Sequence, residues 1–145
     1  MATLYEHVYS NKRISILLII LFFIIIGFLG YVFGLYLGDV FIGIGFAIVL
    51  STIMTLVSYY AGGNIILKMS HAAEADKRKY PHLVNTVEGL AIAAGIPAPK
   101  IYVIDDTAIN AFATGRDPKH AAVTVTTGAI ERLKREELEG VIAHE

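Results

Sequence analysis

The apolar run ISILLIILFFIIIGFLGYVF, residues 14–33, decides the fold class of this chain. A second uncharged apolar run follows at 40–60, after the short linker 34–39. Because about 20 apolar residues cross the hydrocarbon core of a bilayer, both runs are predicted to be transmembrane helices in a tight antiparallel hairpin. A cleaved signal peptide is the alternative for the first run. It is disfavoured because the apolar stretch is too long and no small-x-small site precedes a polar start.

Basic residues flank the two spans asymmetrically. Lys12 and Arg13 precede the first span, Lys68 and the cluster 77–79 follow the second, and the linker has no cation. Because Lys and Arg are retained on the cytoplasmic side of a membrane, both ends of the chain are predicted to be cytoplasmic. We therefore expect a multi-pass protein of the cell (inner or plasma) membrane, with the lipid bilayer as a partner.

Small residues occur in both spans and would allow the two helices to approach closely. An alternative is that glycine is simply common in membrane helices. The residues concerned are Gly27, Gly30 and Gly34 in the first span and Gly43, Gly45 and Ala47 in the second.

The composition excludes several kinds of chemistry. The chain has no cysteine, which removes disulfides, cysteine-based zinc sites and cysteine nucleophiles. Its formal net charge of −1 argues against a general nucleic-acid binder. At 55% hydrophobic residues, it exceeds the roughly 45–50% of soluble domains.

The chain is predicted to consist of a membrane hairpin at 1–61, a helical connector at 62–80 and part of a cytoplasmic domain at 81–145. The end of the connector, 71–80, is alanine-rich and charged, which favours an exposed helix. Pro81 suits the first position of a new helix, and Gly95 suits its end.

Short β-branched or alternating segments follow this helix and predict strands at 101–104, 111–114 and 121–127. The last two strands flank a turn at 115–119 and are predicted to form a hairpin. A short helix through Ile130 and Leu133 should come next, followed by a final helix that begins near Arg135. The fold class predicted for the chain is therefore α+β, with the hairpin at its N-terminus.

The final helix delivers His144 and Glu145. A His-Glu pair opens the H-E-x-x-H motif, in which two imidazoles one turn apart bind zinc and the glutamate acts as general base. Adjacent helical positions differ by about 100°, so the carboxylate can reach the attacking water while the imidazole holds the metal. The alternative is a solvated pair at a helix end. The other histidines and the adjacent Asp105 and Asp106 are predicted to be surface or turn residues, the histidines being His7, His71, His82 and His120.

The segment 110–115 is a second candidate site, because it combines small residues with one aromatic residue. An edge strand with small side chains leaves room for an extended peptide to add by backbone hydrogen bonds. The alternative is an ordinary hairpin strand with Phe112 in the core. The residues are Asn110, Ala111, Phe112, Ala113, Thr114 and Gly115.

The order of these features resembles a known family. A transmembrane hairpin precedes IPAPKIYVI at 96–104, NAFATG at 110–115 and GVIAHE at 140–145. Over essentially its whole length the chain is similar to the N-terminal half of HtpX-type membrane zinc metalloproteases, relatives of the CAAX prenyl proteases. The resemblance implies that 81–145 is the first part of a zincin-like domain, cut at its catalytic helix.

The resemblance also implies roles for particular residues. His144 matches the first zinc ligand, Glu145 the general base, and Asn110 to Gly115 the strand beside the substrate cleft. It further implies Zn²⁺ as cofactor, polypeptide substrates that include membrane proteins, and a part in membrane quality control or the stress response. Homo-oligomerisation is left open.

The chain also differs from the family pattern, because it contains only part of the zinc-binding motif. The family's second histidine and distal glutamate ligand lie beyond Glu145. We therefore expect that this chain alone does not hold zinc and is inactive. The rival hypothesis is a non-catalytic membrane-anchored interaction module.

Overall fold

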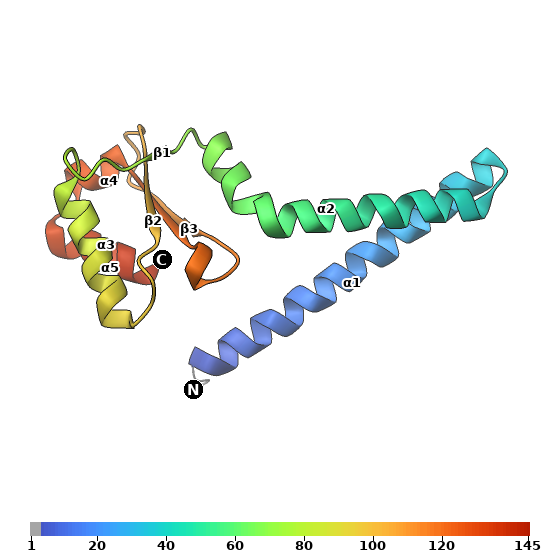
Figure 1. The fold of residues 1–145 in the computed structure, drawn as a ribbon, viewed down its shortest axis with the longest axis horizontal. Coiled ribbons are helices and arrows are strands. Elements are labelled where there is room, and N and C mark those ends of the chain that lie inside the picture. Colours follow the sequence, from blue (N-terminus) through green and yellow to red (C-terminus); the bar gives the residue numbers. More distant parts are fainter. Residues whose placement is uncertain (1–3) are drawn as a thin grey trace. The chain divides into compact units, whose positions relative to one another are not determined.

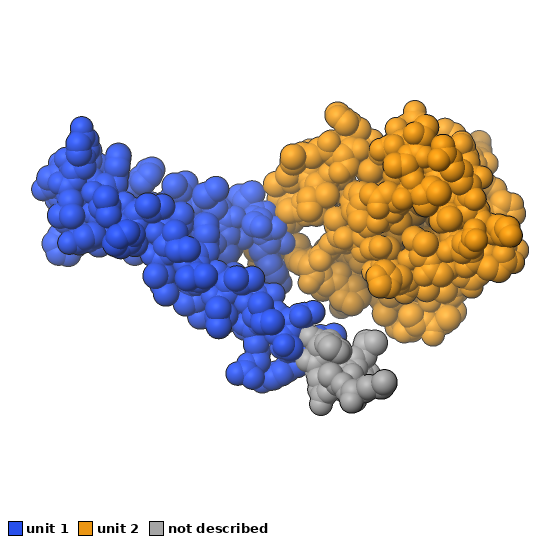
Figure 2. Space-filling view, turned by 180° about the vertical axis from the view of Figure 1, so that it is seen from behind, with its two compact units in different colours: residues 1–59 blue, residues 60–145 orange. Residues whose placement is uncertain are grey.

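The computed structural model describes the backbone of residues 4–145 and the side chains of residues 8–145. The chain forms two compact units, Met1–Tyr59 and Tyr60–Glu145, which Figure 2 colours separately. The first unit holds α1 (Leu4–Leu37) and most of α2 (Val40–Met69). Both helices are long and apolar enough to cross a membrane, as the two apolar runs predicted. Each helix extends beyond its apolar run, so that α2 passes Gly62 and Gly63 and ends at Met69.

The turn between α1 and α2 is closed by Gly38 and Asp39. Gly38 has a positive φ of 86°, a conformation that glycine adopts without steric cost. The Asp39 carboxylate then accepts hydrogen bonds from the N–H groups of Phe41 and Ile42 at 2.9 and 3.2 Å. This capping starts α2 immediately after α1, which produces the hairpin.

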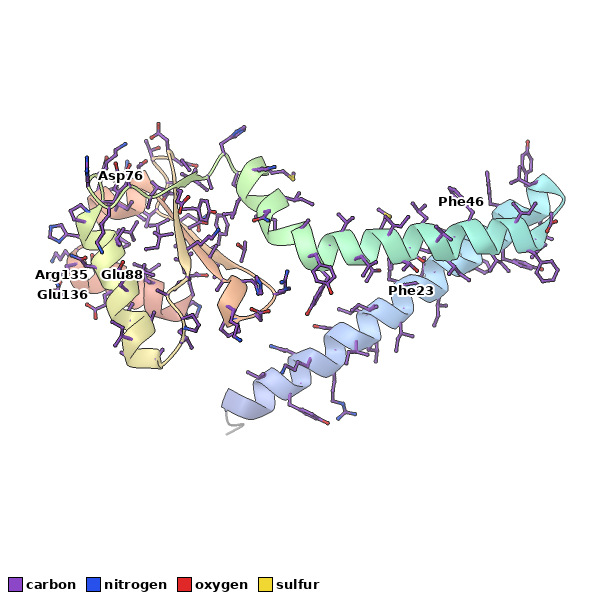
Figure 3. The ribbon with its side chains drawn as sticks, in the orientation of Figure 1. Phe23, Phe46, Asp76, Glu88, Arg135 and Glu136 are labelled. Atoms are coloured by element: carbon purple, nitrogen blue, oxygen red, sulfur yellow. The ribbon has the colours of Figure 1, made fainter. Side chains whose placement is uncertain are left out.

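The contact between the two helices of the first unit is formed by small residues. Gly30 and Gly34 of α1 are buried against α2, and Gly43, Ala47 and Ser51 of α2 are buried in return. Large apolar side chains on the other faces are exposed: Phe46, labelled in Figure 3, is 65% exposed. Exposed apolar surface on this scale suits a bilayer as solvent.

The prediction of close packing was correct for four of the six residues and wrong for Gly27 and Gly45. A Cβ atom added at either of these two would have nothing within 4 Å, so they lie away from the line of contact. Gly45 lies two positions from both Gly43 and Ala47, and on a helix this turns it away from the face that they share. Gly27 lies nearly one turn before Gly30 and is therefore further from the turn that joins the two helices.

The second unit contains a small mixed sheet and three helices. In Figure 1, α3, α4 and α5 lie on one side of the sheet. The elements are β1 (Ala73–Glu74), α3 (Pro81–Ala94), β2 (Lys100–Ile104), β3 (Ala111–Thr114), the 3₁₀ turn η1 (Pro118–His120), β4 (Ala122–Thr126), α4 (Thr127–Arg132) and α5 (Arg135–His144).

The strand order in the sheet is β1-β2-β4-β3. β2 runs parallel to β4, with Val103 opposite Val125, and β3 runs antiparallel to β4, with Phe112 opposite Thr124. The predicted hairpin of β3 and β4 around the Gly115 turn is therefore confirmed. Because β4 lies between two strands, all of its residues are buried, whereas β3 forms an open edge.

A single hydrophobic cluster holds the second unit together. It joins α3, the sheet, α4 and α5, so that the final helix is fixed directly on the sheet. Its buried members are Leu83, Val87, Val103, Val123, Val125, Ala129, Leu138 and Ile142. The predicted limits of α3 are confirmed, with Pro81 at its start and Gly95 at its end with a φ of 67°.

The predicted helical connector at 62–80 requires a correction, since it is helical only as far as Met69. His71 adopts a positive φ of 52°, which breaks the helix, and Ala73 and Glu74 then pair with β2. Backbone pairing with a sheet edge has overridden the helical propensity of the alanines. The segment is then tied to α3 by Lys77, whose ammonium lies 3.0 Å from the carboxylate of Glu88, labelled in Figure 3.

Candidate active site

The final helix α5 presents His144 and Glu145 at its C-terminal end. The helix starts where the Glu137 carboxylate accepts a hydrogen bond from the Lys134 N–H at 2.8 Å. Leu138 and Ile142 are buried in the core one turn apart, and they fix the helix on the sheet. His144 and Glu145 both remain exposed, so their side chains are accessible for chemistry.

The start of β3 is held by Thr126, the last residue of β4. The Thr126 N–H donates to the Asn110 carbonyl at 3.0 Å. The Thr126 hydroxyl accepts from the Asn110 N–H at 3.0 Å and donates to the Ala108 carbonyl at 2.6 Å. These bonds fix where the segment 110–115 joins the sheet and therefore which of its backbone groups face outward.

The structure brings the two predicted site segments together. The N–H of Ala113, on β3, donates to Oε2 of Glu145 at 3.0 Å. Phe112 is only half-buried and does not belong to the core cluster, so the alternative that made it a core residue is not supported. Gly115 ends the strand with a φ of 141°, and a Cβ there would lie 2.6 Å from the His120 carbonyl oxygen.

The other histidines stand apart from this arrangement. His71 and His82 are exposed. His120 is exposed in the turn after β3, where its Nδ1 lies 2.7 Å from Asp117 Oδ1 and its Nε2 lies 2.8 Å from Arg116. The hydrogen bond from His120 lowers the pKa of the Asp117 carboxyl. His7 lies where side chains are outside the described part of the chain.

A catalytic zinc site needs three protein ligands. Within the described residues, no group of three His, Cys, Asp or Glu side chains could hold a metal ion. His144 offers one imidazole, and the carboxylate next to it is hydrogen-bonded to β3. The donor set therefore fits part of a zinc site and not a complete one.

Sequence reasoning missed two contributors to the site. Thr126 was assigned only to a strand, although a threonine at a strand end that precedes a helix is a typical capping residue. Its hydroxyl does accept from the Ala129 N–H at 3.3 Å. The contact of Glu145 with Ala113 spans 32 residues and has no local sequence signal.

The fold and the site define a class of protein, namely a membrane α+β protein whose His-Glu helix end meets the open edge of a small sheet. Residues 77–145 match the family profile "Peptidase family M48". This match, together with the relatives that follow, confirms the predicted resemblance to HtpX-type proteases.

Relatives match along nearly the whole chain. A "Protease HtpX homolog" of Dictyoglomus turgidum is 47% identical over 99% of this chain and 47% of its own length. Proteins of the same name from Caldanaerobacter subterraneus subsp. tengcongensis and Streptococcus thermophilus are 44% and 42% identical, over 99% and 98% of this chain and 48% of their own length. The chain thus spans about half the length of the curated relatives it matches.

Proposed function

We propose that this chain is the N-terminal part of a zinc-dependent membrane endopeptidase that cleaves membrane-associated polypeptides. The observation that carries the proposal is the hydrogen bond between the Glu145 carboxylate and the Ala113 N–H. It joins the residue proposed as general base to the strand proposed to bind substrate. An incidental His-Glu pair at a helix end would have no reason to meet a peptide-binding edge.

Each candidate residue receives a role in this proposal. His144 would be one ligand of the metal, and zinc, when bound, would supply a Lewis acid that polarises the scissile carbonyl. Glu145 would take the proton of the attacking water. The backbone of 110–115 would align an extended substrate by adding it to the sheet as a further strand.

The remaining zinc ligands would lie beyond Glu145. We call this chain together with the downstream half present in its relatives the complete protease. The chain alone would be inactive, because one imidazole and a neighbouring carboxylate give too few ligands for a zinc site.

The cellular setting is also part of the proposal. Two membrane spans would keep both ends of the chain on the cytoplasmic side, as the distribution of Lys and Arg favours. Substrates would include membrane proteins, and the role would be quality control or the stress response. Nucleic acid is not an expected partner, and homo-oligomerisation is left open.

The downstream gene sequence tests the proposal at low cost. The proposal requires a histidine three residues after Glu145, because a helix places that side chain on the same face as His144. A different residue at that position would favour the rival function, a membrane-anchored interaction module. The specific support for that rival is the open edge of β3, which could bind a partner without cleaving it.

A further inference from the structure

We propose that the backbone N–H of Ala113 is a shared donor, which Glu145 occupies while the edge of β3 is empty and which an extended polypeptide takes over on binding. This role rests on the proposed function, because it treats Glu145 as the general base and β3 as the substrate strand. It adds a coupling between the two: docking of a substrate would release the carboxylate that the reaction needs.

The direction of the Ala113 N–H follows from the register of the sheet. Residues of an antiparallel strand alternately turn their backbone groups toward and away from the neighbouring strand. The Asn110 carbonyl accepts from the Thr126 N–H, so Asn110 faces β4, and Phe112 and Thr114, in phase with it, do the same. Ala111 and Ala113 therefore face the open edge, on which an added strand would form its hydrogen bonds.

The chain's own carboxylate already uses one of these two edge donors. Glu145 Oε2 lies 3.0 Å from the Ala113 nitrogen, and an ionised acceptor makes such a bond stronger than a neutral one. The contact is set by the packing of α5, since Leu138 and Ile142 anchor that helix in the core. Among the described residues, no carboxylate is bonded to Ala111, which makes Ala111 a matched reference on the same edge.

Competition follows because a backbone N–H carries a single hydrogen. A polypeptide that pairs with β3 must offer a carbonyl oxygen to the Ala113 N–H. The hydrogen bond between that N–H and the Glu145 carboxylate must then break. Without a bound polypeptide, Glu145 would be hydrogen-bonded to β3. With a polypeptide bound, Glu145 would be free to act as the general base. Removal of the carboxylate should therefore make strand addition easier, even though it removes a residue from the site.

Binding of fluorescein-labelled β-casein to the metal-stripped complete protease, followed by fluorescence anisotropy, tests this coupling. Glu145→Ala should tighten binding about 3- to 10-fold, the equivalent of one hydrogen bond that no longer has to be displaced. Glu145→Gln keeps an acceptor oxygen, although a neutral and weaker one, and should therefore tighten binding less than Glu145→Ala. Equal tightening in both variants would assign the effect to charge and overturn the shared donor, as would unchanged affinity in Glu145→Ala.

Proline variants supply the matched pair, because proline lacks the N–H and is tolerated where that group faces an open edge. In an Ala113→Pro background, Glu145→Ala should no longer change the affinity. In an Ala111→Pro background, the full tightening should persist. The opposite pattern would contradict the assignment to Ala113.

Amide hydrogen exchange keeps the test decisive if a proline variant does not fold. The Ala113 amide should exchange faster in Glu145→Ala than in the wild type, while the Ala111 amide should exchange equally in both. Equal rates at Ala113 would overturn the proposal. These measurements need no metal, so a failure of the proposed hydrolytic function would appear separately, as an absence of casein cleavage by the zinc-loaded wild type.

Discussion

Gly43 of α2 lies against the main chain of Gly30 of α1, so closely that a Cβ on Gly43 would overlap the Gly30 carbonyl oxygen. Gly34 is equally confined, because a Cβ there would lie 2.7 Å from Val40 Cα. In a membrane, where lipid is as apolar as leucine, close packing of this kind is the main attraction between helices.

We predict that Gly43→Leu forces the hairpin helices apart and destabilises their packing by about 1–3 kcal/mol. Gly45→Leu is the matched control, since a Cβ at Gly45 meets nothing within 4 Å, and it should change stability by less than about 0.5 kcal/mol. Unfolding in mixed detergent micelles, followed by helical circular dichroism, would measure both. Equal effects of the two variants would mean that the hairpin does not depend on this contact.

The turn after β3 should respond to acid through Asp117. Its pKa is lowered by the hydrogen bond from His120, so the carboxylate stabilises the fold above the unfolded-state pKa of about 3.9. That stabilisation is lost as the pH falls through the lower pKa of the folded state. The melting temperature of Asp117→Asn should thus lie below that of the wild type at pH 5–6, and the gap should close below about pH 4.

The partner of Asp117 provides the control for this prediction. In a His120→Ala background, Asp117→Asn should produce a smaller gap at pH 5–6, because the largest cause of the lowered pKa is then absent. A gap that is independent of pH, or of His120, would show that the hydrogen bond between Asp117 and His120 has no role in the turn.

The orientation in the membrane can be tested with reporter fusions. Fusions at Ser10 and after Lys79 should report the cytoplasm, and one at Gly38 should report the opposite side, because basic residues flank the spans only at their outer ends. A reporter after Lys79 that faces away from the cytoplasm would reverse the proposed topology.

Local sequence signals accounted for most of the second unit. Pro81 and Gly95 set the limits of α3, and the predicted strand 111–114 matches β3 residue for residue. The predictions that failed concern elements that depend on contacts between residues far apart in the sequence. β1 has only two residues and exists because Ala73 and Glu74 pair with β2, a partnership that nothing within 71–80 signals.

In the candidate site, too, the residues could be predicted from the sequence but their contact could not. His144, Glu145 and the strand 110–115 were candidates by residue type, and their roles were implied by the family resemblance. Their meeting depends on the antiparallel pairing of β3 with β4 and on the packing of α5 through Leu138 and Ile142. A contact across 32 residues is set by that tertiary arrangement, so neither periodicity nor propensity could reveal it.

This chain alone should bind no stoichiometric zinc, since its described residues contain no group of three metal-ligating side chains. Metal analysis after dialysis should find zinc far below one equivalent, and casein cleavage should stay at background. One tightly held equivalent would mean that His71, His82 or His120 is a ligand.

The central claim, that His144 binds the metal and Glu145 is the base, is tested most directly by zinc content and proteolysis of two variants of the complete protease. Glu145→Gln preserves the shape and the ligands, so zinc should be retained while turnover falls about 10²–10⁴-fold. His144→Ala removes a ligand, so zinc and activity should be lost together. Proteolysis at the wild-type rate by Glu145→Gln, on a substrate that the wild type cleaves, would contradict this account.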